Sequence, residues 1–144
     1  MNLDDRMRDA SRCMVCGADS EGGMKMRFAP WGSEGAATRG QIPAFFGGFG
    51  GLAHGGAIAA LLDDAMWWAI HYTCGADTLT AELKVRYHAP IEVQRDLWVQ
   101  GRLLKRRGRL YRAEAAICSE EGDAPLAEGS GSFMTPDDRT LRGR

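Results

Sequence analysis

The chain lacks the features that would direct it to a membrane, the cell exterior or a nucleic acid. The N-terminal stretch MNLDDRMRDASRC contains no apolar signal core, so a cytoplasmic location is expected. The formal net charge of −1 argues against bulk binding of nucleic acid. Four cysteines in a chain of this kind do not make a disulfide scaffold.

No internal repeat or low-complexity linker divides the sequence. The 144 residues, of which 44% are hydrophobic and 26% charged, fit one ordinary globular domain that is long enough to bury a core. We therefore expect a single domain over residues 1–144, with its core between residues 24 and 135. An N-terminal turn and a polar, frayed C-terminal tail would be peripheral to that core.

A single CxxC motif followed by glycine lies at Cys13–Gly17. Such a motif can supply two of the ligands of a zinc site, or it can be a redox-active pair of cysteines. Zinc takes about four ligands, and no second CxxC or HxxxH completes the set, while Cys74 and Cys118 are isolated. A redox motif would need a surrounding βαβ pattern, which is missing. We expect a tight turn ahead of the first strand and no metal site.

The longest apolar segment follows a glycine-rich run and predicts a buried helix. From Ala57 to Ile70 the residues are mostly Ala, Leu, Met, Ile and Trp, without proline or glycine. Its apolar residues do not form one stripe, so the helix should be buried on most sides. A bilayer is excluded because the run is too short and carries Asp63 and Asp64 at its middle. A helix enclosed by a sheet is the better solution.

The spacing of His54 and Asp63 predicts that any site using both is shared between two chains. Nine residues of helix make about two and a half turns, so the two side chains leave on opposite faces, roughly 13.5 Å apart along the axis. They cannot easily act together within one chain. A site built from the head of one helix and the middle of another predicts a two-fold homodimer.

Alternating apolar and polar residues predict the strands that enclose this helix. The stretch 80–87 alternates strictly and is the clearest of them, and it ends before Pro90. Pro30 is expected to end the first strand and residues 31–40 to form a turn. The last three strands, joined by short turns, predict an antiparallel meander. The expected strands are 24–29, 38–46, 80–87, 96–105, 110–119 and 126–135.

Several of these motifs together resemble the hotdog-fold acyl-CoA thioesterases. They are His54-Gly55-Gly56, Leu62-Asp63 at its nine-residue interval, the stretch TAELKVRYHAP at 80–90 and GSGSF at 129–133. The N-terminal CxxCG is also similar to one found in many members. The resemblance covers roughly residues 12 to 135 and is strongest to the phenylacetate-pathway (PaaI-type) branch of the 4-hydroxybenzoyl-CoA thioesterase-like superfamily.

This resemblance implies an α+β hotdog fold, in which five or six antiparallel strands curl around one central helix. Two such units would share a sheet edge in a homodimer, and many members associate further into a dimer of dimers. The implied substrate is an acyl-CoA, with coenzyme A as part of the substrate. No metal, prosthetic group, nucleic acid or membrane is implied as a partner.

The chemistry of thioester hydrolysis assigns roles to four residues. The Gly55 N–H at the helix head is the candidate oxyanion donor, since the head has unpaired N–H groups and glycine admits a close approach. Asp63 of the partner chain would be general base or nucleophile, with its pKa raised by burial beside Met66. His54 would orient the carbonyl or water, although it could instead be a helix cap. Thr80 matches a Ser/Thr that positions the water in relatives.

Further residues are candidates for binding the substrate. Several relatives place Asn six residues before the histidine, where this chain has Gly48, so a backbone group of Gly48 or Phe49 would have to substitute. Gly56 belongs to the helix head, and Asp64 is a reserve carboxylate. Trp67 would line the acyl tunnel unless it belongs to the core. A basic cluster is expected either to contact CoA phosphates or to form a solvated turn; its members are Lys105, Arg106, Arg107 and Arg109.

The sequence thus predicts a homo-oligomeric acyl-CoA thioesterase that hydrolyses an acyl or aryl-acyl thioester to a free acid and CoA. The main alternative is a non-catalytic hotdog module that binds acyl-CoA or another ligand. A purely structural dimer is a third interpretation, and it would leave a carboxylate in an apolar helix unexplained.

Overall fold

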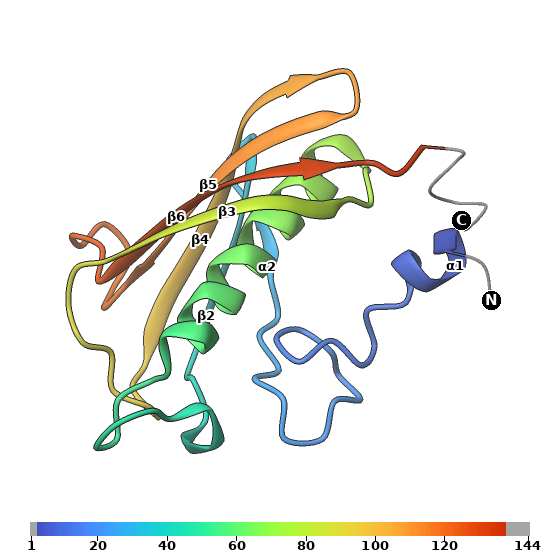
Figure 1. Ribbon diagram of the computed structural model, residues 1–144. Coiled ribbons are helices and arrows are strands. Elements are labelled where there is room, and N and C mark those ends of the chain that lie inside the picture. The colour runs from blue at the N-terminus through green and yellow to red at the C-terminus, as the bar shows by residue number, and fades with distance from the viewer. Residues whose placement is uncertain (1–2, 138–144) are drawn as a thin grey trace.

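The computed structural model describes residues 3–137, and the predicted tail beyond residue 137 lies outside the described part of the chain. Figure 1 shows one long helix held in a curved antiparallel sheet. The helices are α1 (Leu3–Arg8) and α2 (Gly55–Cys74), with a 3₁₀ turn at Ala44–Phe46. The strands are β1 (Ala29–Trp31), β2 (Gly35–Gly40), β3 (Leu79–Tyr87), β4 (Leu97–Arg107), β5 (Leu110–Cys118) and β6 (Ala127–Met134).

The six strands form one sheet in the order β1-β2-β4-β5-β6-β3, and every neighbouring pair is antiparallel. β4, β5 and β6 make the meander that the alternating pattern predicts. β3 pairs with β6 alone, so within the described residues its other edge carries no strand. An unpaired edge of nine residues presents a row of free backbone donors and acceptors.

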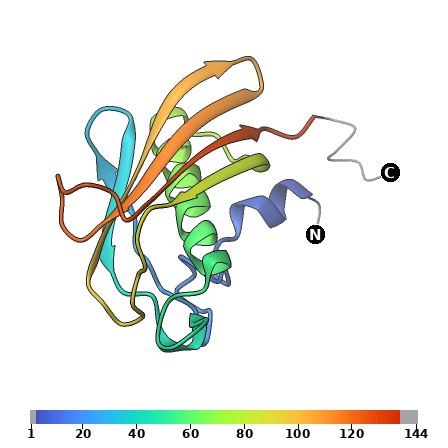
Figure 2. The same ribbon diagram turned by 60° about the vertical axis from the view of Figure 1, so that its left-hand side comes forward.

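The predicted helix is confirmed and is longer than the apolar run at both ends. His54 is its N-cap, and its C-cap is Gly75, which adopts a left-handed conformation with φ of 64° and donates its N–H to the carbonyl of His71. The sheet curls around α2, whose other side faces the N-terminal segment (Figure 2). Eight of its side chains are buried: Ala57, Ile58, Leu61, Leu62, Ala65, Met66, Ala69 and Ile70.

Two expectations about the first strands are wrong. Residues 24–28 do alternate in burial, with Met24, Met26 and Phe28 buried, but they are not part of the sheet. The N–H groups of Met24 and Met26 donate to the carbonyls of Met14 and Val15 instead. An alternation of apolar and polar residues shows only that one side of a segment is buried. Here the segment is buried on one side, but it does not pair with a strand of the sheet.

The region expected to be a turn contains most of the first hairpin. β1 contains Pro30, which a short edge strand accepts because the missing N–H is not needed by a second neighbour. β2 ends at Gly40, so the strand expected at 38–46 is displaced towards the N-terminus. The turn itself is only the three residues between β1 and β2, and the glycines at positions 35 and 40 lie within β2.

The later strands match their predicted ranges to within about two residues. One irregularity falls in β3, where the register shifts between Thr80 and Glu82 and leaves Ala81 without a partner in β6. The expected turn at 106–109 is shorter than predicted, because β4 continues through Arg107.

At Gly101 of β4 the backbone of α2 lies close against the sheet. A Cβ placed there would lie 2.2 Å from the carbonyl oxygen of Ala65, which is helix backbone and cannot rotate away. We expect Gly101→Ala to lower the free energy of unfolding by about 1–3 kcal/mol, because α2 must shift to make room. Urea denaturation measures this change. Gly129→Ala is the control, since its nearest neighbouring atom would be 3.4 Å away, and an equal loss in both variants would contradict the explanation.

Candidate active site

Asp63 and Thr80 form the polar pair at the middle of α2. The Thr80 hydroxyl, in β3, donates to the Asp63 carboxylate at 2.8 Å. Burial raises the pKa of Asp63 above its ordinary value, and the hydrogen bond from Thr80 opposes that rise. Thr80 is exposed and stands on the strand whose edge is unpaired. The carboxylate is therefore partly desolvated yet reachable from the surface beside that edge.

The head of α2 has one backbone donor without a partner. The ring Nδ1 of His54 accepts the N–H of Gly56 at 2.8 Å, so His54 caps the helix. The N–H groups of Ala57 and Ile58 both donate to the His54 carbonyl. Among residues 3–137 no hydrogen-bond acceptor meets the N–H of Gly55. This donor also lies at the positive end of the helix dipole.

Tyr87 fixes the position of this helix head. Its hydroxyl donates to the carbonyl of Gly55 at 2.7 Å, which ties the end of β3 to the first residue of α2. Tyr87 is the last residue of the predicted strand 80–87, and nothing in the sequence marks its hydroxyl as a contact of a residue 32 positions earlier. It is a positioning residue that sequence reasoning missed.

Gly48 lies beside His54, as the six-residue spacing implied. A Cβ on Gly48 would be 3.4 Å from the Cα of His54. The Gly48 N–H donates to the Leu52 carbonyl at 2.7 Å, and the Phe49 carbonyl accepts from Leu52. These two backbone groups, which could have replaced the missing Asn side chain, therefore hold the glycine loop together.

The two halves of the candidate site are not brought together within one chain. α2 runs without interruption from its cap at His54 past Asp63. Nine residues of unbroken helix separate the head from the carboxylate by about 13.5 Å along the axis. The structure thus holds two half-sites, one at each position, and β3 contacts both of them through Tyr87 and Thr80.

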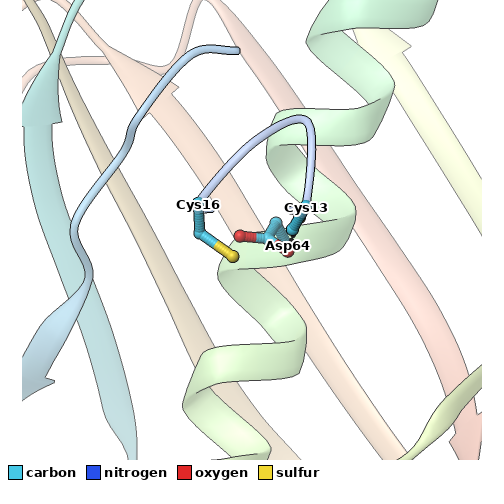
Figure 3. A group of neighbouring side chains, drawn as sticks. All are labelled: Cys13, Cys16 and Asp64. Atoms are coloured by element: carbon cyan, nitrogen blue, oxygen red, sulfur yellow. Dashed lines mark hydrogen bonds between the residues drawn. The ribbon is translucent and has the colours of Figure 1, made fainter. Parts of the chain in front are cut away.

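Asp64 points away from this pair and towards the N-terminal segment. Its Oδ1 lies 3.7 Å from the sulfur of Cys13 (Figure 3). Burial raises the pKa of Asp64 to about 7, and the neighbouring Cys13 adds to that rise. Asp63 and Asp64 are adjacent in sequence but belong to different environments.

Trp67 is held in a polar contact of the helix. Its indole N–H donates to the carbonyl of Thr78 at 2.9 Å, and its ring stacks on His71 with 5.0 Å between the ring centroids. His71 in turn lies 2.9 Å from the carboxylate of Asp77. These contacts anchor the C-terminal half of α2 to the segment that enters β3.

The basic residues expected to bind phosphate lie at the β4–β5 hairpin. Arg106 and Arg107 are both exposed and belong to β4. The Arg106 guanidinium lies 5.2 Å from the centroid of the Tyr111 ring. Successive strand residues project to opposite faces of a sheet, so the two arginines diverge. The hairpin is at the end of the sheet where α2 ends, away from the helix head (Figure 1).

A groove of about 700 Å³ lies elsewhere, across the strands β3 to β6. Its charged lining residues are Lys84, Arg86, Arg102, Glu114 and Glu128. They alternate along their strands with core residues that pack on α2, so the groove is on the outer face of the sheet. It contacts neither Asp63 nor Gly55 and is not the candidate active site.

Comparison with known proteins adds a family to this geometry. Residues 50–125, more than half of the chain, match the model of the thioesterase superfamily. No curated protein matches the sequence. Within the described residues no helix is long and apolar enough to cross a membrane.

Solved structures share the fold at low sequence identity. A thioesterase superfamily protein matches with a TM-score of 0.76 and 24% identity over 84% of this chain, which spans only 62% of that protein. Zebrafish thioesterase superfamily member 2 gives 0.73 and 19%, covering 94% of this chain and 99% of its own. A mutant of the phenylacetic acid degradation protein PaaI from Thermus thermophilus gives 0.66 and 20%, covering 77% and 93%. The chain belongs to the thioesterase superfamily and has its hotdog fold.

Proposed function

We propose that this protein is an acyl-CoA thioesterase that hydrolyses an acyl or aryl-acyl thioester to a free acid and CoA. The observation that carries the proposal is the half-buried Asp63, held by the Thr80 hydroxyl in a chain of the thioesterase superfamily. Burial raises the pKa of this carboxylate, and burying its charge in an otherwise apolar helix lowers the stability of the fold unless the charge is paired. A carboxylate in that position therefore suggests a chemical role. Here its hydrogen-bond partner is a neutral hydroxyl that leaves the second oxygen for a water.

The unpaired edge of β3 supports a homodimer as the active unit. β3 contacts the carboxylate half-site at Thr80 and the helix-head half-site at Tyr87. If two β3 edges pair antiparallel about a two-fold axis near Leu83, Thr80 of one chain comes to lie opposite Tyr87 of the other. Asp63 of one protomer then faces Gly55 of its partner. A further dimer of two such dimers is compatible with this arrangement.

In the proposed reaction the Gly55 N–H and the helix dipole bind the thioester carbonyl oxygen and stabilise the negative charge that develops on it. Asp63 of the partner takes a proton from water, whose oxygen adds to the carbonyl carbon, or attacks that carbon directly. In the first route the carbon–sulfur bond then breaks, the free acid is released, and CoA leaves as a thiolate that takes up the proton held by Asp63. In the second route the carbon–sulfur bond breaks to leave a mixed anhydride between Asp63 and the acyl group, and a water then hydrolyses this anhydride, which frees the acid and supplies the proton that the CoA thiolate takes up. Since Nδ1 of His54 accepts a hydrogen bond, its Nε2–H is the donor that can orient the carbonyl or the water.

The acyl group and the phosphates of CoA would contact residues around Gly55 and Asp63. Gly48 and Gly56 give the acyl group close access to the helix head, and Trp67 borders the carboxylate half-site one helical turn further along. Because Arg106 and Arg107 project to opposite faces of the hairpin, only one of them at a time can donate to a given CoA phosphate. Asp64 is not used in this reaction, because it faces the N-terminal segment.

Removing the Thr80 hydroxyl should slow the reaction without removing the carboxylate. We expect Thr80→Val to lower kcat about 3- to 10-fold, because Asp63 loses the hydrogen bond that orients it. Steady-state kinetics measure the change. Thr78→Val is the matched control, since the buried Thr78 hydroxyl has no hydrogen-bond partner among the described residues. An equal effect of both substitutions would show that the Thr80 contact has no specific role.

Release of free thiol from a panel of short, aromatic and long acyl-CoAs tests the proposed function. The aromatic members include phenylacetyl-CoA, since the similar PaaI structure is named for phenylacetic acid degradation. We expect steady release from at least one member, abolished in Asp63→Asn. Tight binding without release would instead establish a non-catalytic acyl-CoA-binding module and overturn the enzyme assignment.

A further inference from the structure

Two cysteines and a carboxylate meet on the side of α2 that the sheet leaves open. Cys13 and Cys16 come from the N-terminal segment, and Asp64 comes from the middle of the helix. The sulfur atoms and a carboxylate oxygen all lie within 4.8 Å of one another. Figure 3 shows the cysteine turn against α2, with Asp64 directed towards it. The proposed thioester chemistry uses none of these three groups.

The turn that carries the cysteines is built to present both sulfurs on one side. The Gly17 N–H donates to the Cys13 carbonyl at 2.9 Å and closes the turn. A Cβ on Gly17 would lie 2.5 Å from the backbone N of Cys13, so only glycine fits there. The Val15 N–H donates to the Cys13 sulfur at 3.4 Å, which fixes the position of that sulfur in the turn.

A divalent cation would bind both sulfurs as thiolates, the form of cysteine that acts as a metal ligand, and would displace their protons on binding.

One of the two carboxylate oxygens of Asp64 lacks a partner within the described part of the chain, while Oδ1 accepts the weak hydrogen bond from the Cys13 thiol. Its Oδ2 is buried, and among residues 3–137 it has no hydrogen-bond partner. In the same part of the chain no Lys, Arg or His side chain is ion-paired with it. The indole N–H of Trp68, one helical turn away, is also buried, and among the described residues it makes no hydrogen bond of normal geometry. This N–H lies near the Cys16 sulfur. A positive charge in this cluster would compensate for the burial of the carboxylate.

We propose that Cys13, Cys16 and Asp64 form a binding site for a thiophilic divalent cation, with Zn²⁺ as the first candidate. Two thiolates and one carboxylate match the soft and oxygen ligands that zinc accepts. A tetrahedral zinc with ordinary bond lengths separates a sulfur from a carboxylate oxygen by about 3.6 Å. The sulfur of Cys13 and the Oδ1 of Asp64 are 3.7 Å apart, so these two ligands need almost no movement. A water would take the fourth position.

The bound cation would fasten the N-terminal segment to the middle of α2. Ligands that lie 51 positions apart in sequence would become one cross-link, and binding to the folded chain alone stabilises it. The site lies next to Asp63 in sequence but faces the other way. The inference does not depend on the proposed thioesterase activity.

The 144-residue chain, reduced and freed of metal by chelation, tests this site when it is titrated with Zn²⁺ and, separately, with Co²⁺. We expect one equivalent of Zn²⁺ per chain, a rise in the melting temperature, and the intense visible and thiolate charge-transfer bands of tetrahedral Co²⁺ bound to sulfur. Absence of stoichiometric binding would overturn the proposal. A second contradicting result would be that Cys13 and Cys16 form a disulfide spontaneously and that the chain, after this disulfide has been reduced, still binds no metal.

Three variants identify the ligands. Cys13→Ser, Cys16→Ser and Asp64→Asn should each weaken Zn²⁺ binding by about 100-fold or more, since even changes outside the ligand set cost about 10- to 100-fold. Cys74→Ser is the control for a free cysteine outside the cluster and should bind as the parent does. Asp64→Asn keeps the shape of the side chain, so it remains informative if a serine variant fails to fold. Retained affinity in Asp64→Asn, or an equal loss in Cys74→Ser, would overturn the assignment.

Discussion

Asp63→Asn is expected to lower kcat by about 10²-fold or more while leaving the fold intact. The amide has the shape of the carboxylate and can still accept the Thr80 hydrogen bond, but it can neither take a proton from water nor attack the thioester. The free energy of unfolding should be unchanged or higher, because a half-buried charge has been removed. Steady-state kinetics and urea denaturation of the same preparation measure both effects.

A matched acid elsewhere separates this effect from a general loss of charge. Asp123 lies in the exposed turn between β5 and β6, so Asp123→Asn should retain the activity of the parent. If Asp63→Asn turned over the best acyl-CoA at the rate of the parent, Asp63 would have no chemical role. The proposed mechanism would then be wrong.

Gly55→Pro is expected to lower kcat by about 10²- to 10³-fold, the cost of removing one oxyanion donor. Proline at the first helical position deletes the N–H that has no acceptor and is well tolerated there. The preceding His54 already has the extended conformation, with φ of −62° and ψ of 139°, that a following proline requires. The substitution therefore removes the donor while the helix can still form.

Gly55→Ala distinguishes the N–H from the small size of the residue. Alanine keeps the donor, and its Cβ would lie 3.4 Å from the Tyr87 hydroxyl, which can give way slightly. We expect it to stay within about 10-fold of the parent. Equal losses in both variants would show that the absence of a side chain, not the N–H, is what the site needs.

The fold was predictable where one local pattern decided the structure. The helix followed from a long apolar segment without glycine or proline, β3 followed from strict alternation, and β4 to β6 followed from the turns that separate them. The first hairpin was not predictable in the same way. Residues 24–28 alternate as a strand does, yet their backbone hydrogen bonds go to residues 14 and 15. An alternating sequence pattern predicts which side chains are buried, but it does not predict which segment will form hydrogen bonds with the backbone.

In the candidate site, too, some features follow from local sequence and others depend on the path of the whole chain. The nine-residue interval on α2 predicted two separate half-sites, because helix geometry alone fixes that distance. The contact between Tyr87 and Gly55 required the path of β3 past the helix head, which no local pattern encodes. The meeting of Cys13 with Asp64 likewise depends on how the N-terminal segment crosses α2. No spacing motif links Cys13 to an aspartate 51 positions away, so this contact could not be predicted from the sequence.

Activity of a defined heterodimer tests most directly whether the site is shared between two chains. Gly55→Pro and Asp63→Asn chains, co-expressed with different affinity tags and purified on both, give a dimer in which one site combines the intact helix head of one chain with the intact carboxylate of the other. The account predicts about half of the parent activity for this heterodimer, although both parent variants are nearly inactive. The reciprocal dimer, an unaltered chain with a chain carrying both substitutions, should be nearly inactive. Activity in the reciprocal dimer and none in the first would place the whole site within one chain and contradict the account.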